Sequence, residues 1–308
     1  MLEYVVIIVI SLLVIAGCAY SLACLVVAKQ AVNPVRRTTE QVLEEEKTEN
    51  KLDPILQELP FETLEMENQR QQLLKARLYR PETPNGGYLL YNHGYNYPWP
   101  SVLKYLPMLL IRGFTVLVPD HTGEGDSQGK WITFGYYEQQ DSQQWLEKLQ
   151  KEAKDRGETP RFGVMGESMG AVTALLMACK NPQLEFCVAD CPFSSWEEIL
   201  KLRMTEKMGP KWSAILLPGT KLAIRLLTGA KVEEVNPAQA CKTLGVPTVL
   251  IHGEEDTYVP CSMSKAIAKG SKACRLYLIP EAKHAQSFSS APDAYRDILY
   301  SFWDNLGF

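Results

Sequence analysis

A serine held between two glycines is the feature that most constrains how this chain folds. Residues 161–165, RFGVM, have the short apolar pattern of a buried strand, and residues 171–180, AVTALLMACK, have the pattern of a helix. Between them lies GESMG, in which Gly166 and Gly170 flank Ser168. Glycine is used where a side chain would clash or where the backbone turns tightly. The pattern therefore predicts a sharp strand-to-helix corner that holds Ser168 in the open.

An uncharged apolar run extends from Tyr4 to Ala28. As a helix rising about 1.5 Å per residue, it is longer than the ~30 Å hydrocarbon core of a bilayer. A cleaved signal peptide is the alternative, but such a peptide has a basic start and an apolar run of about 7–15 residues. This sequence starts Met-Leu-Glu, and its apolar run is far longer. We therefore expect residues 1–31 to form a retained transmembrane anchor.

Residues 32–60 differ in composition from the run before them. They are rich in charge, contain no aromatic residue and carry an acidic cluster at Glu44, Glu45 and Glu46. A charged segment of this kind is typical of a solvated linker. We expect a charged juxtamembrane stalk, extended or loosely helical, without a catalytic residue.

Residues 61–308 alternate short apolar runs with longer helical patterns. The first runs lack helices between them, which predicts an antiparallel start, and the later alternation predicts an α/β domain with a mostly parallel central sheet and helices on both faces. Residues 193–235 break the rhythm and are interpreted as a helical cap over the sheet. The expected strands are 61–66, 73–79, 88–91, 114–118, 161–165, 186–189, 248–251 and 275–279, and the expected helices are 102–112, 136–156, 171–180 and 263–269.

Charge and cysteine content exclude several classes of partner. A net charge of −4 and a pI near 5.7 leave no basic stripe for nucleic acid. The eight cysteines form no CxxC pair and have no accompanying histidine cluster, so we expect neither a metal nor another cofactor. Cysteines scattered through apolar segments indicate free thiols in a reducing compartment, with structural disulfides as the alternative.

The pattern G-x-S-x-G between a strand and a helix is that of a nucleophile elbow. A serine hydroxyl needs a base to take its proton, and the base needs an acid to orient it. In this architecture the acid and then the base follow the serine along the chain. Asp256, in HGEEDTYVP, and His284, in KHAQSF, each follow an expected strand. The predicted catalytic triad is Ser168, Asp256 and His284.

Other residues compete for two of these roles. Asp190 also ends an expected strand and is the main alternative acid. His93 and His252 each precede a glycine at a strand end, which favours a role in positioning the backbone. His121 lies in a loop that precedes the serine in the sequence. We favour Asp256 as the acid and His284 as the base.

Two backbone N–H groups are expected to form an oxyanion hole, which stabilises charge on a substrate carbonyl oxygen. One belongs to Met169, after the serine, and the other to Tyr95, after an expected strand. Four side chains are candidates for the walls of the substrate pocket. Tyr97 and Trp99 lie in the same loop as Tyr95, Glu167 precedes the serine, and Trp196 lies in the expected cap. Surface packing is the alternative role of the rings.

Five segments occur in an order that carries a resemblance: NHGY (92–95), PDHTGEGDSQG (119–129), GESMG (166–170), HGEEDTYVP (252–260) and KHAQSF (283–288). Through them the chain from residue 61 onward resembles the α/β-hydrolase superfamily, and most of all its bacterial serine aminopeptidase-like and acylglycerol-lipase-like branch. The resemblance implies the same triad, the same oxyanion donors and no cofactor.

Two features depart from the superfamily pattern. The loop that usually reads Asp-x-Arg-Gly-His-Gly-x-Ser has Thr122 and Glu124 at its arginine and histidine positions. The usual Asp-Gly between the first two strands is replaced by ENQRQQ, residues 67–72. Both changes lie outside the predicted triad, but they weaken any transfer of a substrate from relatives.

The residues together indicate a serine hydrolase that forms an acyl-enzyme. The Leu, Ile, Met and Trp content of the cap favours an apolar acyl group, so we expect a small-molecule or lipid-derived carboxylic ester as substrate. A serine peptidase is one alternative, with an acidic clamp for the substrate amine at Glu167, Glu197 or Glu198. A non-catalytic, membrane-tethered binding protein on a hydrolase scaffold is the other, although such proteins usually lose a triad member.

Basic residues set the expected orientation in the membrane. Lys29, Arg36 and Arg37 follow the apolar run, whereas only Glu3 precedes it. Because positive charge is retained on the cytoplasmic side, we expect a single-pass protein with its catalytic domain in the cytoplasm. An exported domain is the alternative.

Overall fold

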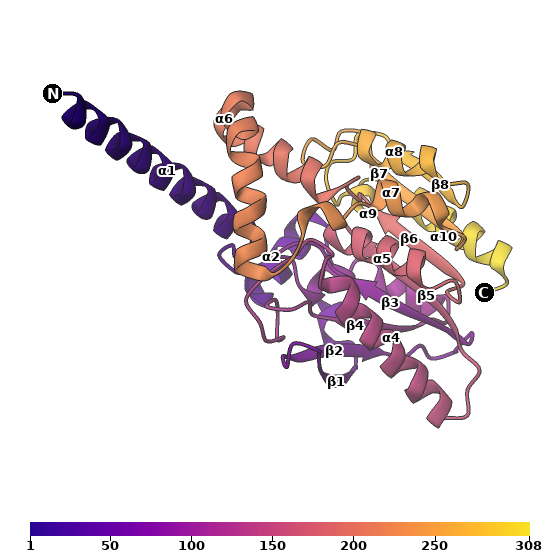
Figure 1. The fold of residues 1–308 in the computed structure, drawn as a ribbon. Coiled ribbons are helices and arrows are strands. Elements are labelled where there is room, and N and C mark those ends of the chain that lie inside the picture. Colours follow the sequence, from indigo (N-terminus) through magenta and orange to yellow (C-terminus); the bar gives the residue numbers. More distant parts are fainter.

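The computed structural model describes the whole chain, residues 1–308 (Figure 1). Eight strands form one sheet in the order β1-β2-β4-β3-β5-β6-β7-β8. β2 is antiparallel to both of its neighbours, β1 and β4, and every other pair is parallel. The strands are β1 Glu62–Glu67, β2 Leu73–Tyr79, β3 Gly87–Asn92, β4 Thr115–Pro119, β5 Arg161–Glu167, β6 Phe186–Asp190, β7 Thr248–Gly253 and β8 Cys274–Ile279.

Helices cover both faces of this sheet, as the sequence predicts. One buried cluster joins the sheet to α4, α5 and α8, and another, on the opposite face, joins it to α3 and α10. The helices are α1 Leu2–Val32, α2 Thr39–Glu49, α3 Leu106–Ile111, α4 Glu138–Asp155, α5 Met169–Lys180, α6 Trp196–Thr228, α7 Pro237–Ala240, α8 Ser262–Gly270, α9 Ser287–Ser290 and α10 Pro292–Leu306.

The central strands explain why the apolar runs identified the fold. β3, β4, β6 and β7 are buried at every position. Burial on both faces is typical of parallel strands covered by helices, and it gives continuous apolar runs rather than alternation. The carboxyl ends of these strands meet at one edge of the sheet, and the loops with the predicted site residues begin there.

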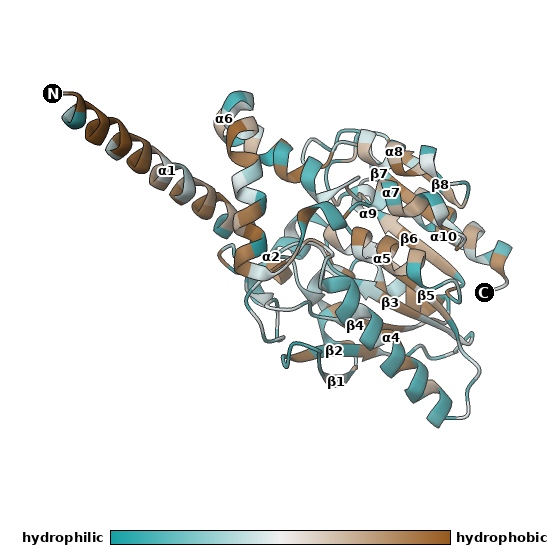
Figure 2. Ribbon diagram, viewed as in Figure 1, coloured by the Kyte–Doolittle hydropathy of each residue, from teal (hydrophilic) through white to brown (hydrophobic).

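α1 projects from the globular domain and is apolar along its length (Figures 1 and 2). It is long and apolar enough to cross a membrane. Residues 2–22 are exposed, and at about 1.5 Å per residue they extend about 30 Å, the thickness of a hydrocarbon core. The C-terminal part of α1 packs against α6, where the Tyr20 hydroxyl donates to the Ile215 carbonyl (3.1 Å) and the Cys24 thiol to the Leu216 carbonyl (3.6 Å).

The expected cap corresponds to α6, which consists of two helical segments joined at a kink. Gly209 has φ 80° and ψ 164°, a conformation outside the helix, and Pro210 follows it. Proline lacks the N–H that would continue the helical ladder, so the second segment starts in a new direction. Both segments bury apolar side chains against α1 and against the start of α5, in a cluster separate from the two sheet clusters.

Residues 32–60 differ from the expected solvated stalk. α2 begins with a capping box, in which the Thr38 hydroxyl accepts the Gln41 N–H and the Gln41 side chain accepts the Thr38 N–H. Val42 and Glu46 of α2 are fully buried, and α2 lies against the 3-10 turn Trp99–Val102. The segment is therefore part of the folded domain. Its charged composition gave no sign of this packing because the buried face is only two or three side chains wide.

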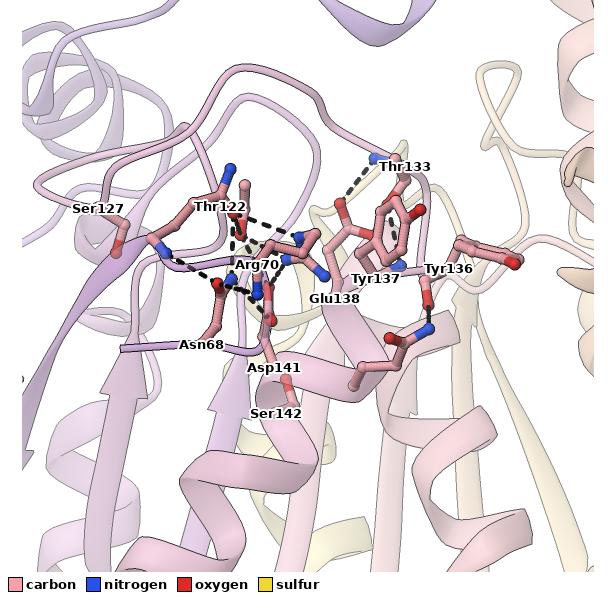
Figure 3. Close-up of polar contacts among 12 residues, drawn as sticks. Asn68, Arg70, Thr122, Ser127, Thr133, Tyr136, Tyr137, Glu138, Asp141 and Ser142 are labelled. Carbon is pink, nitrogen blue, oxygen red and sulfur yellow. Dashed lines mark hydrogen bonds and ion pairs between the residues drawn. The ribbon is translucent and has the colours of Figure 1, made fainter. Parts of the chain in front are cut away.

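Thr122, from one departure from the superfamily pattern, and the ENQRQQ turn, which is the other, meet in one polar network (Figure 3). Arg70, from the ENQRQQ turn, donates to the Asp141 carboxylate (2.5 Å) and to the Thr122 hydroxyl (3.0 Å), and Thr122 donates to Asp141 (2.8 Å). Asn68 donates to Asp141 as well (3.1 Å). The superfamily pattern has an arginine at position 122, where this chain has a threonine. Here the guanidinium comes from Arg70 of the first hairpin, and it joins the loop after β4 to α4.

Candidate active site

Ser168 lies at the corner between β5 and α5, as predicted. Its φ of 55° and ψ of −114° lie outside the regions that non-glycine residues favour. A Cβ on Gly166 would lie 2.2 Å from the Gly170 carbonyl oxygen, and one on Gly170 would lie 1.9 Å from the Asn92 carbonyl oxygen. Both glycines are therefore required by close backbone contacts, which hold β5, α5 and the end of β3 together around the serine.

The structure brings the three predicted triad residues together. Ser168 Oγ lies 3.0 Å from His284 Nε2, and His284 Nδ1 lies 2.7 Å from Asp256 Oδ2. These side chains follow β5, β8 and β7, respectively. In such an arrangement the imidazole can accept the hydroxyl proton at Nε2 while the carboxylate holds the ring through Nδ1–H.

Asp256 is buried and is stabilised in its ionised form. Its Oδ1 accepts the backbone N–H groups of Tyr258 (2.9 Å) and Val259 (2.7 Å), and His252 Nε2 lies 3.2 Å from Oδ2. Burial alone would raise the pKa of this carboxyl, but hydrogen bonds from His252, His284 and the Val259 N–H, with the charge of His284, outweigh burial and lower the pKa to about 2. The carboxylate is therefore charged at neutral pH.

Asp190, the alternative acid, belongs to a different network. Its carboxylate accepts hydrogen bonds from the hydroxyls of Tyr105 (3.2 Å) and Ser287 (3.1 Å), and burial raises its pKa to about 6. Among the competing histidines, His93 accepts the His121 N–H at Nε2 (2.9 Å), so it positions backbone as expected, and His252 lies beside Asp256 (3.2 Å).

The expected oxyanion donors lie beside Ser168. The N–H groups of Tyr95 and Met169 donate no hydrogen bond within the chain. Met169 is the first residue of α5, so its N–H is among those that a helix leaves without an intrahelical acceptor. Gly94 brings the other loop close, because a Cβ on it would lie 3.7 Å from the Ser168 Cβ. Both donors are available to an oxygen of a bound molecule.

Two pockets meet at Ser168. The first, which we call the apolar pocket, has a volume of about 390 Å³, and its walls include Val27, Ala31, Phe134, Trp196, Leu200 and Met204. The second, the polar pocket, has a volume of about 420 Å³, and its walls include Glu46, Glu49, Tyr97, Lys104, Glu167 and Gln286. Met169 lines only the apolar pocket, and His284 lines only the polar pocket.

Three of the four side chains expected to form the substrate pocket line these cavities. Trp196 lines the apolar pocket, and Tyr97 and Glu167 line the polar pocket. Trp99 lines neither, which corrects its assignment: its ring is buried under Arg77, whose guanidinium carbon lies 4.1 Å from the ring centroid. The sequence identified an aromatic loop but not the turn that directs Trp99 into the core.

Sequence reasoning missed the contribution of the N-terminal segment to the site. Val27 and Ala31 of α1 line the apolar pocket, and Glu46 of α2 lines the polar pocket. No motif spacing connects these residues to Ser168. The acidic cluster around Glu46 was the one available signal, and its position in a charged segment indicated solvent exposure instead.

One group of side chains near Ser168 has the composition of a metal site. Ligand atoms of Cys191, Asp256 and His284 lie within 4.8 Å of one another. Two of these residues, Asp256 and His284, are already joined by a 2.7 Å hydrogen bond. The grouping follows from that hydrogen bond, and we assign it no metal.

Comparison with known proteins places the fold. Residues 71–222 match the X-Pro dipeptidyl-peptidase (S15) family. The uncharacterized protein YqkD of Bacillus subtilis is 34% identical over 232 residues, which are 73% of each chain. An esterase from Pyrococcus furiosus has a TM-score of 0.64 at 20% identity, covering 90% of this chain and 100% of its own. A hydrolase from Pseudomonas aeruginosa has a TM-score of 0.58 at 20% identity, covering 78% of this chain and 98% of its own.

The sheet order, the strand–turn–helix corner and these likenesses define the α/β-hydrolase fold. The chain belongs to the α/β-hydrolase superfamily, in the same family as its Bacillus subtilis relative.

Replacing Asp256 by Asn removes the charge beside His284 and keeps the side-chain shape. We expect a fluorophosphonate probe to label Ser168 about 10⁴-fold more slowly, the scale of the loss in kcat for this substitution in a serine–histidine–aspartate site. Asp190→Asn is the matched control, since it alters a buried carboxyl at the end of the neighbouring strand β6. It should slow labelling far less. Time courses on the detergent-solubilised full chain make the comparison, and equal losses in both variants would contradict the role of Asp256.

Proposed function

We propose that this protein is a serine hydrolase that cleaves a carboxylic ester through an acyl-enzyme on Ser168. The observation that carries the proposal is the hydrogen-bonded path from Ser168 Oγ through His284 to Asp256. Beside it lie two N–H groups without an acceptor, those of Tyr95 and Met169. A nucleophile, a base, an orienting acid and oxyanion donors are the parts that acyl transfer requires.

The proposed reaction has two halves. His284 takes the Ser168 proton as Oγ attacks the carbonyl carbon, and the N–H groups of Tyr95 and Met169 stabilise the resulting oxyanion. His284 then gives the proton to the departing alcohol oxygen as the carbon–oxygen bond breaks. Water attacks the acyl-enzyme by the same route and releases the carboxylic acid. Throughout, Asp256 holds the tautomer of His284 and stabilises its charged form.

The apolar pocket supports an ester of an apolar acid, whether small or lipid-derived. Of its 19 lining residues, 13 are hydrophobic, and its volume of about 390 Å³ falls in the range of sites for small molecules. An esterase is among the proteins of similar fold, which supports the same choice.

A serine peptidase is the second candidate. The match to the X-Pro dipeptidyl-peptidase family favours it, and Glu167 lines the polar pocket, where a carboxylate would bind a substrate amine. All three expected clamp residues already have partners: Glu167 pairs with Lys104 (2.7 Å), and Glu197 and Glu198 bond Lys221 and Ser194, respectively. We rank the ester first because the apolar pocket suits an acyl chain. A non-catalytic binding protein is the third alternative. It ranks last because binding alone does not require the hydrogen-bonded path from Ser168 through His284 to Asp256.

Replacing Ser168 by Ala removes the proposed nucleophile. We expect kcat on p-nitrophenyl butyrate to fall by about 10⁶-fold, as in comparable triads, and fluorophosphonate labelling to be lost. Ser301→Ala, an exposed serine of α10, is the control and should behave as wild type. Turnover by Ser168→Ala at the wild-type rate would refute the mechanism. Esters of graded acyl length and aminoacyl anilides are assayed in parallel, and faster cleavage of anilides would favour the peptidase.

We further propose that residues 1–31 are a retained single-pass anchor for the hydrolase domain, which consists of residues 61–308 with residues 32–60 packed against them. The exposed part of α1 has the length of a membrane span. Val27 and Ala31 line the apolar pocket, and the Tyr95 hydroxyl donates to the Ala31 carbonyl (2.8 Å). A signal peptide removed by cleavage would take these contacts with it, so they support retention of α1.

The basic residues that follow α1's apolar stretch, Lys29, Arg36 and Arg37, support a cytoplasmic catalytic domain. A tag placed after Phe308 tests this orientation by protease treatment of intact cells. We expect the tag to survive in intact cells and to be digested after lysis. Digestion without lysis would place the domain on the exported face.

A further inference from the structure

The polar pocket contains a buried carboxylate that the proposed mechanism does not use. Glu46 is fully buried. Its Oε2 accepts a hydrogen bond from Asn50 (2.8 Å), but its Oε1 has no hydrogen-bond partner. Lys104 Nζ lies 3.8 Å from this Oε1 and 2.7 Å from Glu167, with which it forms the closer ion pair. Buried polar atoms normally have partners, so Glu46 offers an unused acceptor where it lines the pocket.

The polar pocket lies on the leaving-group side of Ser168. In the proposed reaction His284 returns a proton to the leaving-group oxygen, and His284 lines the polar pocket but not the apolar pocket. An ester bound across Ser168 therefore has its acyl chain in the apolar pocket and its alcohol portion in the polar pocket.

Charge around the polar pocket is negative. Four carboxylates and two cations line it: Glu45, Glu46, Glu49, Glu167, Arg37 and Lys104. Arg37 pairs with Glu45, and Lys104 pairs most closely with Glu167. Glu46 and the exposed Glu49 therefore remain to interact with a bound molecule. Such carboxylates bind hydroxyl groups and ammonium groups. A hydroxyl donates a hydrogen bond to a carboxylate oxygen, and an ammonium group attracts it through its positive charge.

We propose that the polar pocket is a leaving-group subsite in which Glu46 and Glu49 bind an alcohol carrying hydroxyl or ammonium groups. This inference rests on the proposed ester hydrolysis and narrows its substrates to amphipathic esters. The apolar acyl chain lies against α1 and the cap, and the polar head group lies against α2.

Three decanoate esters test the subsite on the detergent-solubilised full chain: the monoglyceride, the choline ester and the propyl ester. We expect wild-type kcat/KM for the glyceride or the choline ester to exceed that for the propyl ester by about tenfold, the scale of one interaction with a charged group. A preference for the glyceride would indicate that the subsite binds hydroxyl groups, and a preference for the choline ester would indicate that it binds an ammonium group. Glu46→Gln removes the charge and keeps the shape, and it should reduce this preference by about tenfold.

Two further variants complete the test. Glu49→Gln changes an exposed side chain, so it folds even if Glu46→Gln does not, and it should also reduce the preference. Glu44→Gln is the matched control, because Glu44 is exposed on the same helix and does not line the pocket. Equal wild-type rates on the three esters, or a preference that survives both substitutions, would overturn the subsite. If the chain hydrolyses no ester, the proposed function fails, and the subsite with it.

A different observation, the outer face of α6, carries a second inference. Its second segment exposes four large apolar side chains at helical spacing: Trp212 (60%), Ile215 (53%), Leu222 (57%) and Leu226 (78%). Lys211 and Arg225 are exposed on the same segment, and residues 210–228 contain no acidic residue. A contiguous apolar face of this kind marks an interaction surface.

The second segment of α6 lies beside the C-terminal part of α1 (Figure 2). Tyr20 bonds the Ile215 carbonyl, and a Cβ on Gly219 would lie 2.5 Å from Cys24 Sγ, which shows how closely the two helices approach. Because residues 2–22 match the hydrocarbon thickness, the contact at Tyr20 lies at the level of the membrane surface. An apolar helix with basic and no acidic residues is typical of one that lies in an anionic membrane interface.

We infer that the second segment of α6 lies in the headgroup region of the membrane that α1 crosses, as a second contact with an anionic bilayer. α1 and the first segment of α6 line the apolar pocket, and the second segment follows directly after the Gly209 kink, so this contact holds the pocket close to the lipid surface.

Fluorescence quenching tests the contact with the full chain in vesicles of phosphatidylcholine and phosphatidylglycerol. Lipids with brominated acyl chains should quench part of the tryptophan fluorescence of the wild-type protein. Trp212→Phe should lack the quenched part of the fluorescence. Trp145→Phe, which removes a tryptophan buried in the core, should leave the quenched part unchanged. Equal emission of Trp212 in brominated and ordinary vesicles would overturn the inference. So would quenching that disappears as the protein-to-lipid ratio rises, because a second copy of the chain would then cover this face.

A functional comparison separates the membrane contact from the chemistry. Leu222→Asp should slow turnover of an ester embedded in these vesicles by about tenfold or more, because a charge replaces an apolar contact with lipid. It should leave turnover of soluble p-nitrophenyl butyrate unchanged. Ile111→Asp, at a similarly exposed position on α3 (79% exposed), is the matched control for both substrates. An equal effect of the two substitutions on the embedded ester would count against the contact.

Discussion

The close backbone contact around Ser168 is the constraint on which the rest of the structure depends. With φ at 55°, the serine adopts a conformation that costs on the order of 1–3 kcal/mol and persists only where its surroundings impose it. Those surroundings are the Gly170–Asn92 approach and the fully buried strands on both sides. Since α5 begins at the next residue, the same corner presents the hydroxyl and the Met169 N–H together. The sheet thus provides the rigid support for both groups.

A buried lysine connects this corner to segments far away in the chain. Lys104 Nζ pairs with Glu167, beside the serine, and donates to the carbonyl of Ala285 (3.2 Å), beside the histidine; it also lies near Glu46 of α2. Burial alone would lower the pKa of Lys104, but the charges of Glu167 and Glu46 outweigh burial and raise it. A buried charge without partners is strongly destabilising, so α2 and the loops that carry Ser168 and His284 must assemble around this ammonium together.

The strands, the nucleophile corner and the meeting of Ser168, His284 and Asp256 were predictable from the sequence because each has a short local signal. Continuous apolar runs mark buried parallel strands, and the G-x-S-x-G corner fixes the order in which acid and base follow Ser168. The folded position of α2 was not predictable, since Val42 and Glu46 make a buried face too narrow to show as periodicity. The inward turn of Trp99 depends on stacking with Arg77 of β2, a long-range contact that the residues around Trp99 do not reveal.

The N-terminal segment holds the loop that carries the proposed oxyanion donor Tyr95. The Tyr95 hydroxyl donates to the Ala31 carbonyl, the Arg37 N–H donates to Asn96 Oδ1 (3.1 Å), and the Asn96 amide donates to the Val35 carbonyl (2.9 Å). Asn96 itself has a positive φ of 54°, so the turn needs such external contacts to persist. An oxyanion donor acts only when it is held within hydrogen-bonding distance of the developing charge. Residues 31–37, which leave α1, thereby join the proposed catalytic geometry to the proposed membrane anchor.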